Sequence, residues 1–237
     1  MDNVSKRSYK KGFVLFFILL FPSVLYLFLS SGNHNFTLPI FGPRHPVEAN
    51  ENGETRTDTI YHTIPEFEFV NQYGEKVSHK DFEGKIYVTD FFFTTCKSIC
   101  PIMSNHMSRV QDSLVNMKDV LFLSHTVDPE YDSVHVLLDY AQTMGAEKGT
   151  WHFVTGEKKE LYNIARKGYF ITAMEGDGGP EDFIHSEKFV LIDKQGRIRG
   201  YYDGTDEEDI DRLLDEVKVL KFEEFIPRKE KKNDKSN

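Results

Sequence analysis

Strand-like and helix-like patterns of apolar residues alternate along the later part of the chain. The runs Ile86–Phe93 and Val120–Val127 are almost continuously β-branched or aromatic, which is typical of strands covered on both faces. Between them apolar residues recur at steps of three and four, which predicts one face of a helix. The members of that face are Met103, Met107, Val110, Leu114 and Met117.

The alternation continues to the end of the domain. A strand around Ile64–Val70 with a short partner precedes the first buried strand, and a hairpin over 189–202 precedes a final helix. Strands that alternate with helices predict an α/β fold with a mixed sheet. The order matches a thioredoxin-like fold with N-terminal β additions. The elements expected in between are a helix over 134–144, a strand over Trp151–Thr155 and a helix around Leu161–Ala165.

An uncharged apolar run occupies residues 13–31. Its length is sufficient for a single transmembrane helix, and proline is tolerated in such helices. The basic residues Lys6, Arg7, Lys10 and Lys11 precede it, which predicts a cytoplasmic N-terminus, 1–12. A cleaved signal peptide is the alternative. In both interpretations the rest of the chain is exported across the membrane.

Composition divides residues 32–237 into three parts. Residues 32–60 are rich in Asn, Pro, Gly, Thr and Glu without periodicity and are expected to form a linker. Residues 61–222 are expected to form the folded domain, and 223–237 a charged tail. The chain has a formal net charge of −9 although its two ends are basic, so the domain is acidic. An acidic domain argues against nucleic acid as a partner, because phosphate binding needs positive potential.

The two cysteines of the chain, Cys96 and Cys100, lie where the first buried strand meets the first helix. A disulfide framework would use more cysteines at wider spacings, so the pair indicates a metal or redox site. The helix N-terminus favours thiolate, and the spacing lets both sulfur atoms reach one centre. A plain structural disulfide is the alternative.

Two thiolates suit Cu(I), and an imidazole would complete a three-coordinate site. Of the nine histidines, His185 differs from the others because it follows a Gly-rich loop, Glu175–Pro180, and immediately precedes the predicted hairpin. In a thioredoxin-like sheet that hairpin lies beside the cysteine-bearing strand. Each of the other histidines is expected to be an ordinary surface or packed side chain.

Asp90 is a carboxylate inside an apolar strand, six residues before Cys96. Burial would raise its pKa, which makes it a candidate proton acceptor for thiol chemistry. The alternative is a strand-end carboxylate bonded to the backbone or to the turn.

Five segments spread over about residues 62–220 together resemble the Sco/SenC family. The first contains both cysteines and resembles the copper-site segment, and the fourth contains His185 and resembles the distal histidine with its following strand. Lys97 departs from the family, since many members have Pro after the first Cys. The segments are Asp90–Pro101, Ser124–Glu130, Trp151–Gly156, Asp182–Ser186 with the following Val190–Asp193, and Tyr202–Gly204.

The resemblance implies a thioredoxin-like fold that binds one copper ion, as Cu(I) or Cu(II), through Cys96, Cys100 and His185. It implies a role in assembling the dinuclear copper centre of cytochrome c oxidase subunit II. The expected partners are that subunit or a similar copper protein and, through the N-terminal helix, a membrane. The expected location is a bacterial inner membrane, single-pass, with the C-terminal domain in the periplasm.

The leading hypothesis is therefore a metallochaperone rather than a turnover enzyme. The alternative is a membrane-anchored thiol-disulfide reductase that acts on a partner's cysteines, with Cys96 and Cys100 as the redox pair and Asp90 as proton acceptor. A sensor that only binds a partner is a third hypothesis. His185 discriminates between the first two, because a reductase does not require it.

Overall fold

The computed structural model of the protein describes residues 3–30, 37–51, 54–171 and 186–223. The chain divides into two compact units, residues 1–36 and 37–237. In the first unit helix α1 (Asn3–Ser30) contains nearly all of the uncharged run. When the described residues are searched, no helix combines the length and the hydrophobicity needed to cross a membrane.

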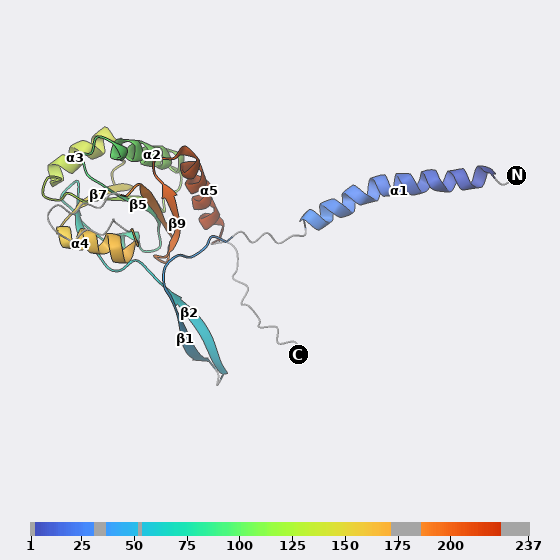
Figure 1. The fold of residues 1–237 in the computed structure, drawn as a ribbon, viewed down its shortest axis with the longest axis horizontal. Helices are drawn as coiled ribbons and strands as arrows, with labels where there is room; N and C mark the ends of the chain where they lie inside the picture. Colours follow the sequence, from blue (N-terminus) through green and yellow to red (C-terminus); the bar gives the residue numbers. More distant parts are fainter. Residues whose placement is uncertain (1–2, 31–36, 52–53, 172–185, 224–237) are drawn as a thin grey trace. The chain divides into compact units, whose positions relative to one another are not determined.

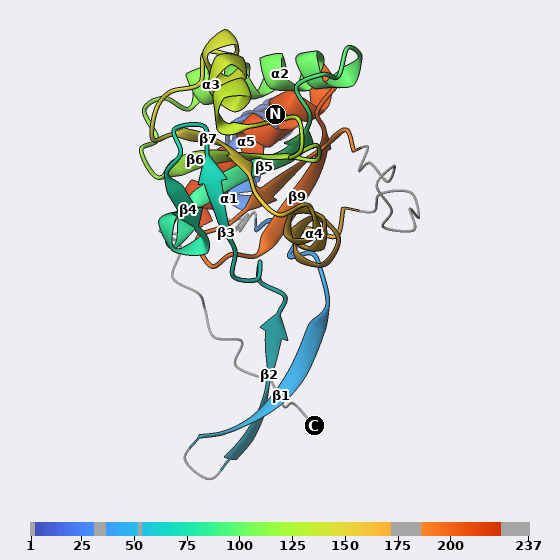
Figure 2. The same cartoon turned by 90° about the vertical axis from the view of Figure 1, so that its left-hand side faces the viewer.

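The second unit is built on a seven-stranded sheet with the order β4-β3-β7-β6-β5-β8-β9 (Figures 1 and 2). The centre is parallel, with β6 between β5 and β7, and antiparallel hairpins flank it on both sides. This mixed sheet confirms the predicted α/β class and the N-terminal β additions, which are β3 and β4. The strands are β3 (Glu68–Asn71), β4 (Lys76–Ser78), β5 (Ile86–Phe92), β6 (Val120–Thr126), β7 (Trp151–Thr155), β8 (Lys188–Ile192) and β9 (Ile198–Asp203).

Helices cover both faces of the sheet, which is why every residue of β5 and β6 is buried. Residues of α2, α3 and α5 pack on one face, and α4 with its π-helical continuation packs on the other. The helix predicted around Leu161–Ala165 thus begins as a short α-helix and continues as a π-helix. The helices are α2 (Ile99–Ser113), α3 (Val134–Thr143), α4 (Lys158–Asn163), η2 (Ile164–Gly168) and α5 (Glu207–Glu223), with a short 3-10 helix, η1 (His79–Phe82).

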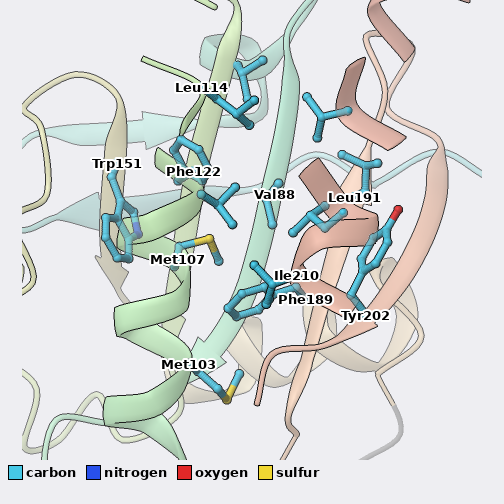
Figure 3. Close-up of a cluster of buried hydrophobic side chains, with 14 of the residues drawn as sticks. Val88, Met103, Met107, Leu114, Phe122, Trp151, Phe189, Leu191, Tyr202 and Ile210 are labelled. Carbon is cyan, nitrogen blue, oxygen red and sulfur yellow. The ribbon is translucent and has the colours of Figure 1, made fainter. Parts of the chain in front are cut away.

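The core between α2 and the sheet follows the predicted periodicity. Met103 and Met107 of α2 are fully buried, and Figure 3 shows Met107 and Leu191 on either side of Val88 of β5. Trp151 from β7 and Ile210 from α5 belong to the same cluster. Burying a side chain of this size contributes about 1.5–3 kcal/mol, so this cluster fixes α2 on the sheet. The position of α2 in turn fixes Cys100.

The stretch 32–60 differs from the expected linker. Strands β1 (Arg44–Glu51) and β2 (Glu54–Tyr61) pair antiparallel along their whole length. Figures 1 and 2 show this ribbon extending away from the seven-stranded sheet. The sequence carries a signal for it, since an Asn-Gly pair between runs with Thr, Val and Ile favours a hairpin. The predicted strand at Ile64–Val70 also begins later, at Glu68.

The segment 37–43 is bound to the domain as well. The amide of Phe41 donates to the carbonyl of Ile198 on β9 at 2.9 Å. Arg199, only 3% exposed, donates to the carbonyls of Leu38 at 2.7 Å and Pro39 at 3.0 Å. Glu223 at the end of α5 accepts from the amide of Leu38 at 2.6 Å. The chain therefore enters the domain along β9, a long-range contact that no local pattern predicts.

Candidate functional site

The two cysteines lie on either side of the junction between β5 and α2. Cys96 is partly exposed in the loop that follows β5, and Cys100 is buried in the first turn of α2. The amide of Cys96 donates to the carbonyl of Phe93 at 3.2 Å, and its sulfur lies 3.6 Å from the hydroxyl of Ser98. Both are free thiols. The structure thus confirms the predicted strand–turn–helix setting of the pair.

The two thiols differ in acidity. Partial burial acts to raise the pKa of Cys96, but hydrogen bonds from Cys100 and Ser98 outweigh it and lower that pKa to about 7. Burial raises the pKa of Cys100 to about 12, although the Phe93 backbone acts in the opposite direction. Cys96 is therefore the thiol that ionises first, and it is also the more exposed one. This is the arrangement expected of a reactive or metal-binding thiol.

Asp90 lies on β5, buried on the same side of the sheet as α2. The hydroxyl of Ser124 donates to its carboxylate at 2.5 Å, and the indole N–H of Trp151 donates to Ser124 at 2.9 Å. The carboxylate thus accepts from Ser124 of β6, and Trp151 of β7 binds the same Ser124 hydroxyl. Its burial raises the pKa of Asp90 to about 7, and its charge raises the pKa of Cys100. The role of proton acceptor stays a prediction.

Replacing Asp90 with Asn is expected to change how stability depends on pH. The folded protein holds the Asp90 proton more tightly than the unfolded chain, where an Asp has a pKa of about 3.9. This contribution to stability is fully present below about pH 4 and is lost as the pH rises through 7. The unfolding free energy of Asp90→Asn relative to wild type should therefore rise by roughly 4 kcal/mol between pH 4 and 8.

Urea unfolding of the copper-free protein at several pH values measures this difference. Asp139→Asn is the matched control, since Asp139 is exposed on α3. A difference between Asp90→Asn and wild type that stays constant across this pH range would contradict the assignment.

His185 lies outside the residues that the structure describes. The strand after it is described: β8 pairs antiparallel with β5, with Val190 opposite Thr89. The start of β8 therefore lies at the end of β5 where the cysteine loop begins. Within the described residues, no group of three or more His, Cys, Asp or Glu side chains could hold a metal ion.

Helix α2 is tied to the start of β8. The ring of His106 on α2 hydrogen-bonds the carbonyl of Gly204 at 2.8 Å, and the amide of Gly204 donates to the carbonyl of Glu187 at 2.6 Å. A Cβ on Gly204 would lie 2.9 Å from the Phe189 ring, so glycine is required for this close approach. Nothing in the sequence indicated this role for His106, because its partner Gly204 is distant in sequence and the two meet only in the folded domain.

His125 and His152, both in predicted strands, are packed side chains as expected. His125 is fully buried on the face of the sheet away from α2, stacked on Phe91 at a ring distance of 4.7 Å. Its burial lowers the pKa of His125 to about 3. Burial likewise lowers the pKa of His152. Neither is positioned with the cysteines.

The SCO1/SenC family model matches residues 55–220, which include both cysteines, Asp90 and His185. The chain belongs to the SCO1/SenC family. Strand β1 (Arg44–Glu51) lies before the matched residues, so the first strand of the ribbon is not part of the family match.

Individual relatives agree with this membership. The SCO1 protein homolog of Bacillus subtilis (strain 168) is 31% identical over 168 residues, which are 70% of this chain and 86% of that protein. The structure of BsSco, a member of the Sco family of cytochrome c oxidase assembly proteins with a disulfide switch, is 30% identical with a TM-score of 0.58. The match covers 67% of this chain and 93% of BsSco.

A third relative was solved with metal. Arabidopsis thaliana ScoI with copper bound is 25% identical with a TM-score of 0.55, over 68% of this chain and 99% of that one. The likeness to these SCO1/SenC structures confirms the thioredoxin-like fold predicted from the order of strands and helices.

One residue of the site was missed by the sequence analysis. Asp132 is fully buried in the loop between β6 and α3, and it hydrogen-bonds Thr94 at the start of the cysteine loop. Its only sequence signal is its place two residues after the family-like segment Ser124–Glu130.

Proposed function

We propose that this chain binds one copper ion through Cys96, Cys100 and His185 and acts as an assembly factor for cytochrome c oxidase. In this role it delivers copper to, or prepares, the dinuclear copper site of subunit II. The observation that carries the proposal is the pair of free thiols of contrasting acidity at the start of α2. Arabidopsis ScoI was solved with copper bound, and BsSco belongs to a family of oxidase assembly proteins, which supports the same role here.

The three proposed ligands suit a Cu(I) ion. Thiolates are soft ligands that favour Cu(I), and a neutral imidazole completes a three-coordinate site. Cys96 ionises near neutral pH and is accessible, so it is the first ligand to meet an incoming ion. Cys100 must lose its proton on binding, and Asp90 is the candidate acceptor. The start of β8 beside the cysteine loop supports His185 as the third ligand.

Titration of the reduced, full-length protein in detergent with Cu(I) tests the proposal. We expect one Cu(I) per chain with two sulfur ligands and one nitrogen ligand, determined by X-ray absorption. The affinity should fall as the pH is lowered, because protons compete for the thiolates and the imidazole. A chain that binds no Cu(I), or binds it without sulfur, would overturn the proposal.

A second function is favoured by one observation. A thiol with a pKa of about 7 beside a second, buried thiol is a suitable attacking group for thiol–disulfide exchange. BsSco carries a disulfide switch. The alternative is therefore a thiol-disulfide reductase that acts on a partner's cysteines, for which Cys96 and Cys100 suffice. Substitutions of His185 and of the two cysteines separate these functions.

The proposal extends to location. Residues 13–31 form the anchor, residues 1–12 stay in the cytoplasm, and the domain faces the periplasm of a bacterial inner membrane. The basic cluster before the uncharged run supports this orientation. A reporter fused after residue 60 is expected to be active only outside the cytoplasm. Activity on the cytoplasmic side would contradict the orientation, and N-terminal sequencing distinguishes an anchor from a cleaved signal.

A further inference from the structure

A buried carboxylate, Asp132, clamps the start of the cysteine loop. Asp132 is fully buried, and three donors point to it. The amide of Thr94 donates at 3.2 Å, the hydroxyl of Thr94 donates to the other carboxylate oxygen, and the hydroxyl of Thr126 donates at 2.5 Å. A buried carboxylate is tolerated only when its oxygen atoms are hydrogen-bonded in this way.

The clamp itself is anchored on two elements. The amide of Asp132 donates to the carbonyl of Asp128 at 2.9 Å, which closes the turn, and Ser133 is the N-cap of α3. Thr126 is the last residue of β6 and lies opposite Phe92 of β5. Asp132 is therefore held in place by the sheet on one side and by a helix on the other.

One peptide unit links Asp132 to Cys96. The Thr94 amide that donates to Asp132 belongs to the same peptide as the Phe93 carbonyl, and that carbonyl accepts from the amide of Cys96 at 3.2 Å. A peptide is planar, so fixing its N–H fixes its C=O. The orientation of this one peptide plane thus bears directly on Cys96.

We propose that Asp132 is a positioning residue of the copper site, which holds the Phe93–Thr94 peptide so that Cys96 is presented beside Cys100 before metal arrives. This inference rests on the proposed function. It adds that the loop is preorganised by a carboxylate from the neighbouring β6–α3 loop. Groups that orient metal ligands from the outer shell typically change affinity by 10–100-fold when removed.

The variants Asp132→Asn, Thr94→Val and their combination test the clamp in full-length, detergent-solubilised protein. Asparagine keeps the shape but presents an N–H₂ group where the clamp needs an acceptor. We expect Cu(I) affinity, measured by competition with a chelator, to fall about tenfold or more in each single variant. The double variant should bind no more weakly than Asp132→Asn alone, because the Thr94 hydroxyl acts through its contact with Asp132. Glu130→Gln, the same charge change at an exposed site in the same loop, should bind as wild type.

Hydrogen exchange of the copper-free protein supplies a readout that a general loss of stability would not reproduce. In Asp132→Asn the amides of Thr94 and Cys96 should exchange faster, whereas those of Val88 and Thr89 in the middle of β5 should not change. Wild-type affinity in Asp132→Asn, or uniformly faster exchange along β5, would overturn the inference. A wild type that binds no Cu(I) would overturn the proposed function instead, and the exchange of Thr94 and Cys96 would still decide whether the clamp exists.

Discussion

Replacing Cys96 or Cys100 with Ser is expected to abolish Cu(I) binding and the maturation of the oxidase copper centre. A serine hydroxyl is a hard, poorly ionised group and does not replace a thiolate at Cu(I). The loss of affinity should exceed the 10–100-fold that is typical of removing an outer-shell partner. His185→Ala leaves both sulfur atoms, so it should weaken copper binding less, and added copper should restore part of the maturation.

Oxidase activity and copper content of membranes from cells that carry each variant measure this result. His135→Ala is the matched control, because His135 is an exposed histidine on α3. It should behave as wild type. The pattern across the variants separates the two functions. Normal maturation in His185→Ala, together with failure of both cysteine variants, would refute copper delivery and favour the thiol reductase.

Replacing Arg199 with Met is expected to lower the free energy of unfolding by about 3–5 kcal/mol. The guanidinium is buried between Asp193, at 3.0 Å, and Glu223, at 2.8 Å, and it also binds the carbonyls of the entering segment at Leu38 and Pro39. Its removal leaves the buried Asp193 with Arg197 as its ion-pair partner and takes a donor from Glu223 and from both carbonyls. Removing one partner of a buried ion pair is far more destabilising than removing one at the surface.

Urea unfolding followed by fluorescence measures this effect, because the single tryptophan, Trp151, lies in the core of the domain. Arg109→Met is the control, since the ion pair of Arg109 with Asp211 is exposed and should contribute less than about 1 kcal/mol. The entering segment should also become sensitive to protease in Arg199→Met. Equal effects of the two substitutions would show that the Arg199 cluster does not hold this segment.

The sequence by itself determined the elements that are set by local patterns. Continuous apolar runs at 86–93 and 120–127 and the three-and-four spacing from Met103 to Met117 predicted β5, β6 and α2, because burial on both faces or on one face leaves that signature. The cysteine pair was placed at the strand–helix junction for the same reason. The motifs along the chain predicted the SCO1/SenC family, which the family match confirms.

The sequence also contained a hairpin signal in residues 32–60, but the polar composition of that stretch favoured a linker. Residues 32–60 are polar and irregular, and this outweighed the Asn-Gly pair that favours the β1–β2 hairpin. The role of segment 37–43 had no local signal at all. Its partners Ile198, Arg199 and Glu223 lie about 160 residues or more away in sequence.

Only the tertiary structure decided how the site is supported. Asp90 stood out as a carboxylate in an apolar strand, but its partner Ser124 comes from another strand and is itself bound by Trp151 of a third. No local pattern linked Asp132 to the cysteines, because its effect on Cys96 passes through Thr94, which is adjacent only after β5 and β6 pair. Periodicity reports which face of an element is buried. Which buried polar groups meet depends on strand order and register, and these are fixed by the packing of the whole domain.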